Sequence, residues 1–199
     1  MARPREFDEQ AVLDAAVRCF WAQGYGATSI KDLIDHTGLS SASLYNAYGD
    51  KSALFQSALA HYVQRSIGGR IQHCESLPPR DAVEVFFQDI VRRSLADGER
   101  KGCMVVNSAL ELAPHDPAVR QSVAEVLHRI ESFFRSCIER GQADGSITCS
   151  QPAVAMAQHF LSVLMGVRVL ARVRPERSLL EGVVRTALAS LGPASNGES

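Results

Sequence analysis

Apolar residues recur with the spacing of an amphipathic helix from near the start of the chain. Between residues 13 and 21 they occupy positions i, i+3, i+4, i+7 and i+8, which lie on one face of a helix. These residues are Leu13, Ala16, Val17, Phe20 and Trp21. The glycines of the following segment, QGYGATS, indicate that the helix ends there.

A short second helix is predicted after this segment. Its apolar residues are Ile30, Leu33 and Ile34. Thr28 and Ser29 have the hydroxyl side chains that cap helix starts. Gly38 fits the left-handed conformation that often follows a helix end. The pattern therefore predicts a helix with a capped start and a glycine stop.

The segment from Ser40 to Tyr48 predicts a third helix with a narrow apolar face. Ser40 caps its start, and Leu44 is its one aliphatic side chain larger than alanine. Asp50 then caps a fourth helix, whose apolar positions come in pairs. Because little of the third helix can be buried, we expect its other face to serve in binding.

Longer helices are predicted after the segments SIGGR and LPPR. They span about residues 81–97, 103–112, 117–141, 152–173 and 175–191. No run alternates apolar and polar residues for long enough to suggest a strand. The expected fold class is all-α, with a small N-terminal helical domain at 6–66, a larger helical domain at 67–192 and a disordered tail at 193–199.

Composition is that of an ordinary soluble globular protein. The chain has 199 residues, 46% of them hydrophobic and 22% charged, and a formal net charge of -1. Its first residues, MARPREFDEQ, lack the apolar core of a secretory signal, so we expect a cytoplasmic protein. Five scattered cysteines without a C-x-x-C pair disfavour a disulfide framework and a zinc site. We expect no metal and no cofactor.

One segment has the low charge of a membrane span, because no Lys, Arg, Asp or Glu occurs between Asp144 and Arg168. Polar residues interrupt the segment, so its apolar run is shorter than the roughly 20 residues that cross a bilayer. We therefore expect a helix buried in a protein interface, and no membrane partner.

Two short helices joined by a turn at Gly38 describe a helix-turn-helix, at about residues 28–48. The exposed face of its second helix is predicted to enter the major groove of DNA. Small side chains there allow close approach to base edges, and longer polar ones reach phosphates or bases. The predicted DNA-binding residues are Thr28, Ser40, Ser41, Ala42, Ser43, Tyr45, Asn46, Tyr48 and Lys51.

The stretch ATSIKDLIDHTGLSSASLYNAYGDKSALF, residues 27–55, resembles the signature of the TetR family of bacterial transcription regulators. The matching elements are Thr28-Ser29, Gly38-Leu39-Ser40, Leu44-Tyr45, Lys51 and Leu54-Phe55. The rest of the chain matches mainly in helical pattern and length. Tyr48 stands where the family more commonly has phenylalanine, and Ala47 where it often has a bulkier residue. Both departures bear on operator preference.

The resemblance implies a homodimer held by the helices at 152–173 and 175–191, with a ligand pocket in each larger domain. Two recognition helices would then meet successive major grooves about 34 to 36 Å apart on a palindromic operator of double-stranded DNA. The expected function is a ligand-responsive regulator of transcription. In this family the regulator is usually a repressor that a small-molecule effector releases from DNA.

The candidate ligand-binding residues are mostly aromatic or sulfur-containing residues at helical spacing in the larger domain. They are Phe86, Phe87, Ile90, Cys103, Met104, Asn107, Phe133, Phe134, His159 and Met165. Packing in the core is the commoner role for such residues. Asn107 and His159 are the polar exceptions, and either one orients a ligand or bonds a neighbour inside the bundle.

Cys103 raises alternatives to simple ligand binding. It follows Lys101 near the start of a helix, where a cation and the helix dipole favour a thiolate. The surrounding stretch resembles a TetR subgroup in which some members sense electrophiles through a nearby cysteine. The alternatives are a thiol-based redox or electrophile sensor of the same fold and, outside regulation, a helical ligand-binding protein or a cysteine-dependent enzyme. We expect no enzyme, because no paired nucleophile and base are visible.

The predicted DNA-binding domain is not basic overall. Residues 1–66 hold six basic and seven acidic side chains. Arg3, Arg5 and Lys51 can still face the DNA, and neutral donors also bind phosphate. We therefore predict a comparatively shallow salt dependence of DNA binding.

Overall fold

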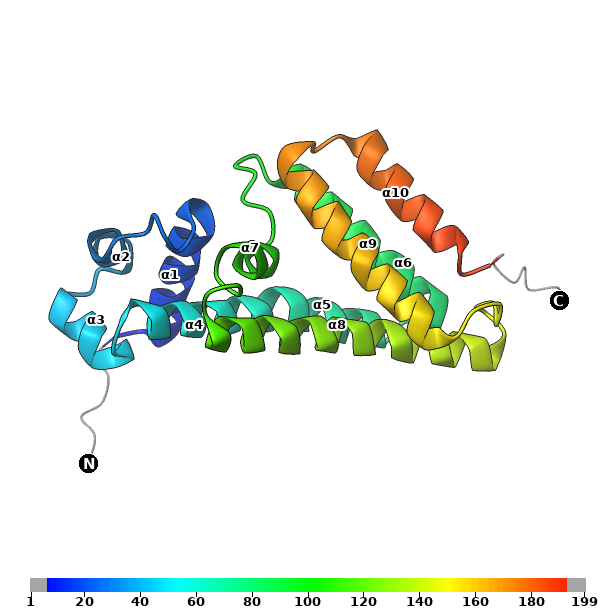
Figure 1. Cartoon of the computed structure of the whole chain (residues 1–199), viewed down its shortest axis with the longest axis horizontal. Helices are drawn as coiled ribbons and strands as arrows, with labels where there is room; N and C mark the ends of the chain where they lie inside the picture. Colours follow the sequence, from blue (N-terminus) through cyan, green and yellow to red (C-terminus); the bar gives the residue numbers. More distant parts are fainter. Residues whose placement is uncertain (1–6, 193–199) are drawn as a thin grey trace, which may run out of the picture. The chain divides into compact units, whose positions relative to one another are not determined.

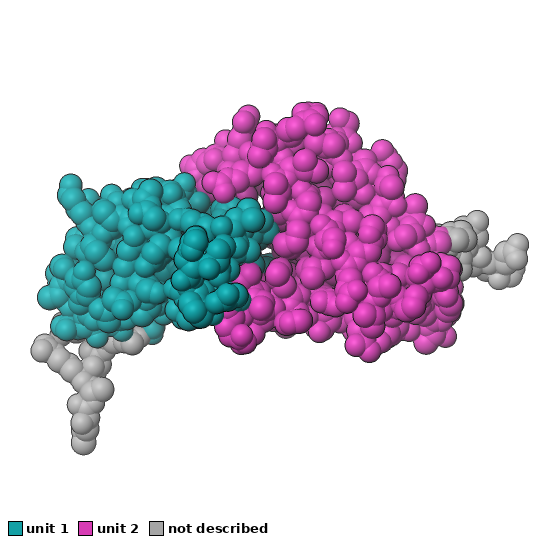
Figure 2. Space-filling model, viewed as in Figure 1, with its two compact units in different colours: residues 1–67, 103–120 teal, residues 68–102, 121–199 magenta. Residues whose placement is uncertain are grey.

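The computed structural model describes residues 7–192, and within that range it contains helices and no strand (Figure 1). The predicted all-α class is confirmed. The helices fall into two compact units, which Figure 2 colours separately: unit 1 comprises residues 1–67 and 103–120, and unit 2 comprises 68–102 and 121–199. Residues 103–120 thus pack with the N-terminal residues. One boundary in the chain therefore does not separate the two units. Arg3, Arg5 and the predicted tail at 193–199 lie outside the described residues.

The helices of unit 1 begin close to their predicted positions. They are α1 (Glu9–Gln23), α2 (Ile30–Thr37), α3 (Ser41–Tyr48), α4 (Lys51–Tyr62), the π-helical η1 (Val63–Gly68) and α7 (Met104–Glu111). α1 packs against α2 and α4, and α4 also contacts α7. Val12, Ala16 and Phe20 of α1 are buried, as are Leu54 and Phe55 of α4. Of the apolar positions predicted for the first helix, Ala16, Val17 and Phe20 are buried, whereas Leu13 and Trp21 are half-buried and Val12 is buried instead.

Side chains cap these helices where the sequence predicted caps. Ser29 Oγ accepts a hydrogen bond from the Asp32 N–H at 3.1 Å, and the Asp32 carboxylate accepts one from the Ser29 N–H at 2.8 Å. Ser40 Oγ accepts from the Ser43 N–H at 3.1 Å, and Asp50 accepts from an N–H of α4 at 2.8 Å. The bonds from Ser29 lower the pKa of Asp32. Part of the acidic charge in unit 1 therefore satisfies its own helix starts.

The helical run that begins with α4 continues across the expected domain boundary between residues 66 and 67. η1 and α5 (Gly69–Glu75) carry it through the SIGGR segment, and Gly68 has helical φ and ψ of -58° and -49°. Each interior glycine costs about 1 kcal/mol relative to alanine. Ile67, Ile71 and Cys74 are nevertheless buried along this run. Burial outweighs the weak helix propensity of glycine, so the chain stays helical across the expected domain boundary.

The described part of unit 2 contains α5, α6 (Pro79–Ala96), most of α8 (Pro117–Asp144), α9 (Ala153–Val173) and α10 (Arg177–Ala189). Phenylalanines of α6, α8 and α9 form its aromatic core. The ring centroid of Phe134 on α8 lies 5.1 Å from that of Phe86 and 5.5 Å from that of Phe87, both on α6. Phe160 on α9 lies 5.8 Å from Phe134. α6 also contacts α5 and α10, so it is the central helix of the unit.

Two glycine substitutions should have opposite effects on stability. Gly38 has φ of 71°, and a Cβ built there meets nothing within 4 Å, so strain arises from the backbone alone. We expect Gly38→Ala to lower the free energy of unfolding by about 1–2 kcal/mol. Gly69 also has open space around a Cβ but lies in a helix. Gly69→Ala should therefore raise the free energy of unfolding by about 0.5–1 kcal/mol. Urea unfolding of both variants checks this, and equal signs would contradict it.

Asp89 of α6 is the centre of an ion cluster in unit 2. Its carboxylate accepts from Arg70 at 2.7 Å and from Arg93 at 2.8 Å, and it also pairs with Arg92. Burial raises the pKa of Asp89, but the hydrogen bonds and charges of these arginines outweigh burial and bring it to about 2. The folded value is therefore below the unfolded value of about 3.9. The cluster stabilises the fold above about pH 4, and this contribution is lost as the pH falls towards 2.

We expect Asp89→Asn to lower the free energy of unfolding by about 3 kcal/mol at pH 7, because Arg70 loses its buried counter-charge. The variant should also lose less stability than the wild type between about pH 4 and 2.5. Urea unfolding at the three pH values measures both effects. Glu181→Gln is the matched control, since its partner Arg177 is exposed and such pairs contribute about 0–1 kcal/mol. An acid decline as steep as that of the wild type would contradict the role of Asp89.

Candidate nucleic-acid interface

α2 and α3 contact each other and are joined by the turn at Gly38. The Gly38 N–H donates to the Ile34 carbonyl at 2.9 Å, which closes the end of α2. Leu33 of α2 and Leu44 of α3 are each 0% exposed. One fully buried leucine thus anchors each short helix. Ile30 and Ile34 of α2 are half-buried beside Leu33, whereas the remaining residues of α3 are small, polar or tyrosine.

Four predicted DNA-binding residues share the exposed side of α3. Ser41, Ala42, Tyr45 and Asn46 are all exposed, and Tyr45 keeps 44% of its surface. Positions i, i+1, i+4 and i+5 lie on one side of a helix. We name these four residues the recognition face. It combines small side chains with a phenol and an amide, which can donate to or accept from base edges and phosphates.

Three other predicted residues contribute to the local fold. The Ser40 hydroxyl caps α3 and donates to Ser43 Oγ at 2.9 Å. Thr28 is only 1% exposed, and its hydroxyl donates to the Gly24 carbonyl at 2.6 Å. Tyr48 is half-buried at the end of α3. Direct DNA contact by these residues remains a prediction, and the side chain of Thr28 already has a structural role.

Lys51, the first residue of α4, is placed by an aromatic ring. Its Nζ lies 4.3 Å from the ring centroid of Tyr25, a cation–π distance. Tyr25 in turn lies 5.1 Å from Phe55 and 6.1 Å from Phe20, centroid to centroid. Sequence reasoning missed Tyr25. The available signal was an aromatic residue between two glycines directly before the helix-turn-helix.

Positive charge in unit 1 is partly neutralised within the unit. Arg65 Nη1 lies 2.7 Å from Asp14 Oδ2, and His61 Nε2 lies 2.7 Å from Asp14 Oδ1. The bonds from His61 and Arg65 lower the pKa of Asp14 despite an opposing effect of burial. Arg65 is thus engaged within the unit, which agrees with a shallow salt dependence of DNA binding, and that dependence stays a prediction.

A capped helix-turn-helix with a polar exposed second helix defines a DNA-binding protein of the helix-turn-helix class. Residues 12–58 match the family described as bacterial regulatory proteins, tetR family, and residues 79–187 match the tetracyclin repressor-like C-terminal domain. The chain therefore belongs to the tetR family. The protein is therefore a DNA-binding transcriptional regulator, as the sequence predicted.

Relatives along nearly the whole chain agree with this family. The uncharacterized HTH-type transcriptional regulator YezE of Bacillus subtilis (strain 168) is 30% identical, covering 96% of this chain and 100% of the relative. The HTH-type transcriptional repressor ComR of Escherichia coli (strain K12) is 27% identical, with 93% and 88% covered. A cysteine mutant of the TetR family regulator CifR, solved with double-strand operator DNA, is 32% identical with a TM-score of 0.84, covering 96% of this chain and all of CifR.

The predicted ligand-binding residues occur in both units. Cys103, Met104 and Asn107 belong to unit 1 and the other seven to unit 2. Most are packed: Phe86, Phe87, Ile90, Phe133 and Phe134 are buried in unit 2, and Cys103 and Met104 are buried in unit 1. Asn107 and Met165 are half-buried, and His159 is exposed on α9. Their binding role stays a prediction.

Cys103 is the residue immediately before α7, as the helix-start interpretation predicted. It is only 7% exposed, and the Tyr62 hydroxyl donates to its sulfur at 3.8 Å. Burial restricts access of oxidants or electrophiles to a thiol. The structure thus favours a packing role for Cys103, and thiol sensing remains a prediction without support from exposure.

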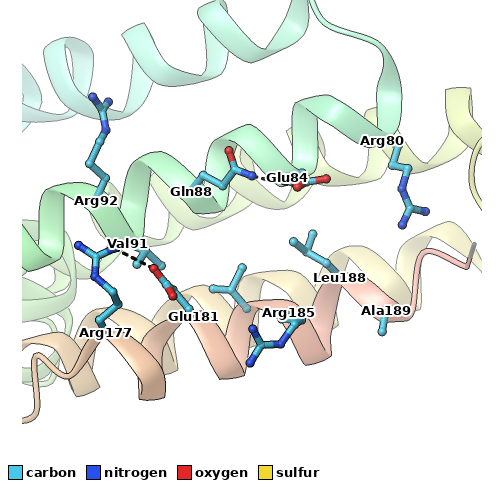
Figure 3. Close-up of a pocket in the computed structure, with 11 residues that line it drawn as sticks. Arg80, Glu84, Gln88, Val91, Arg92, Arg177, Glu181, Arg185, Leu188 and Ala189 are labelled. Atoms are coloured by element: carbon cyan, nitrogen blue, oxygen red, sulfur yellow. Dashed lines mark hydrogen bonds and ion pairs between the residues drawn. The ribbon is translucent and has the colours of Figure 1, made fainter. Parts of the chain in front are cut away.

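A groove of about 840 Å³ lies between α6 and α10 in unit 2 (Figure 3). Its lining residues are Arg80, Glu84, Gln88, Val91, Arg92, Arg177, Glu181, Val184, Arg185, Leu188 and Ala189. Several of its polar groups bond within the unit: Arg177 pairs with Glu181 at 2.8 Å, and Arg80 donates to the Gly192 carbonyl at 2.8 Å. None of the ten predicted ligand-binding residues lines this groove.

Proposed function

We propose that the protein is a cytoplasmic, homodimeric repressor that binds a palindromic operator and is released from it by a small molecule bound in unit 2. The observation that carries the DNA-binding part is the recognition face, exposed on a helix that one leucine anchors. The repressor part is supported by the relative ComR, which is an HTH-type transcriptional repressor.

A second copy of the chain is the proposed partner of α9. This helix is long and apolar enough to cross a membrane by length and composition, yet only 33% of its most apolar stretch is buried. Its uncovered side also carries the exposed Gln158 and His159, and we name its valines and small residues the open face of α9. They are Val154, Ser162, Gly166, Val169 and Val173. Small residues allow close helix approach, and burying valines stabilises association.

The effector is proposed to act on the packing of unit 2. The phenylalanines of α6 and α8 are in contact, so a ligand among them must move side chains and thereby change how these helices pack. Only a difference in affinity between two conformations shifts their populations. Moving the protein from about 1:99 to 99:1 requires roughly 5.5 kcal/mol of differential binding.

Selection of bound sequences from a random duplex pool tests this function. The purified full chain is used at fixed salt under reducing conditions. We expect enrichment of one palindrome whose half-sites are about 10 base pairs apart, centre to centre, or a multiple of that spacing. The enriched duplex then serves as the probe for effectors that release the protein. A folded dimer that enriches no sequence would contradict the proposal.

A further inference from the structure

Glu111, the last residue of α7, binds the loop between α1 and α2 within unit 1. Its Oε1 accepts a hydrogen bond from the Gly26 N–H at 2.8 Å, and its Oε2 accepts a longer one from the Tyr25 N–H at 3.4 Å. These two N–H groups belong to the peptide planes on either side of the Tyr25 Cα. The carboxylate therefore restricts both backbone torsions of Tyr25.

The loop approaches this carboxylate closely because it is rich in glycine. A Cβ at Gly24 would lie 3.1 Å from Glu111 Oε2, and Gly24 has φ of 83°, which other residues rarely adopt. The loop is also held from its carbonyl side, where the buried Thr28 hydroxyl donates to Gly24 at 2.6 Å. The segment around Tyr25 is thus fixed by hydrogen bonds at the Tyr25 N–H, the Gly26 N–H and the Gly24 carbonyl.

The position of Glu111 is unfavourable for α7 itself. A carboxylate at the C-terminal end of a helix is repelled by the negative end of the helix dipole. Consecutive backbone N–H groups, in contrast, form a favourable site for an anion. The loop, rather than the stability of α7, therefore explains why a carboxylate is suited to this position.

Tyr25 in turn positions Lys51, which is a predicted DNA-binding residue. The Tyr25 ring packs against Phe20 and Phe55, and the Lys51 ammonium lies 4.3 Å from its centroid. A cation–π contact depends on ring position, so a displaced Tyr25 displaces the Lys51 ammonium. Glu111, Tyr25 and Lys51 therefore form one chain of contacts inside unit 1.

We infer that Glu111 is a positioning residue for DNA binding, which fixes Tyr25 so that its ring holds the Lys51 ammonium at the DNA backbone. This inference rests on the proposed DNA contact of Lys51. Glu111 needs no contact with DNA for this role. The direct electrostatic effect of Glu111 on DNA affinity has the opposite sign to its positioning effect, because a carboxylate near DNA repels phosphates.

The sign of the effect of Glu111→Gln therefore separates positioning from plain electrostatics. Removing a negative charge should strengthen DNA binding if charge alone matters. Positioning predicts weaker binding by about 10-fold, with a salt slope that is shallower by about 0.9 for each phosphate that is no longer neutralised. Operator affinity is measured at several salt concentrations with the duplex obtained by selection. Glu139→Gln, an exposed carboxylate of α8, is the matched control and should leave affinity and slope unchanged.

Lys51→Met and the double variant complete the test. We expect Lys51→Met to reduce affinity and slope, and Glu111→Gln to add little once Lys51 is removed. Tyr25→Leu, with Glu111 intact, should reproduce the shallower slope even if the Glu111 variant unfolds. If Lys51→Met weakens binding but Glu111→Gln does not, the positioning role is overturned and the proposed function stands. If Lys51→Met itself has no effect, the DNA contact of Lys51 is overturned, and the positioning role with it.

Discussion

Val169→Glu is expected to convert the protein to a monomer and to weaken operator binding by about 100-fold or more. Val169 is 44% exposed in the middle of the open face of α9, which we propose a second copy covers. A dimer binds its second half-site as an intramolecular event, so dimerisation strengthens binding by about 10²–10⁴-fold over one half-site. A carboxylate buried in an apolar interface without a partner carries a large desolvation penalty.

Light scattering and operator binding should be measured on the same preparation. Ser136→Glu on α8 is the matched control, because it adds the same charge to an exposed helical position outside α9 and α10. It should stay dimeric and bind normally. A Val169→Glu variant that remains a dimer would show that the interface lies elsewhere, whatever happens to DNA binding.

Tyr45→Ala is expected to weaken operator binding by about 30-fold or more without loss of stability. Tyr45 projects from the recognition face and is 44% exposed, so the free energy of unfolding should change by less than about 0.5 kcal/mol. In the dimer the substitution alters both recognition helices, and a specific interaction with a base contributes about 1–3 kcal/mol. Removing one such interaction from each helix gives the expected factor even at the lower limit.

Tyr45→Phe and Leu44→Ala separate the possible causes. The phenylalanine variant retains the ring, so it reports the contribution of the hydroxyl alone. Leu44 is 0% exposed, and its truncation should destabilise the protein by about 2–5 kcal/mol, which gives the signature of a folding defect. Binding by Tyr45→Ala at the wild-type affinity would remove Tyr45 from the DNA-binding residues.

Local patterns were sufficient to predict the helix-turn-helix. Ser29, Gly38, Ser40 and Asp50 act within a few residues of their own position, so their roles as caps and stop were readable from sequence. The two-sided character of α3 was also readable from sequence, because Leu44 is its one large aliphatic residue and small or polar residues surround it. That the helical run passes through the glycines at 68 and 69 was not readable from sequence, because glycine propensity is a weak local preference that burial of Ile67, Ile71 and Cys74 overrides.

The sequence by itself therefore determined the helical class, the helix-turn-helix and four residues of its exposed face, since helix periodicity and capping are set by near neighbours. Only the tertiary structure decided that residues 103–120 pack with the N-terminal residues, and that Glu111 meets Tyr25 and Gly26, 86 and 85 positions away. The tertiary structure also decided which of the predicted DNA-binding residues are buried, and Thr28 is one of them. Such contacts join residues distant in the chain, and no local spacing encodes which distant backbone N–H groups a carboxylate will meet.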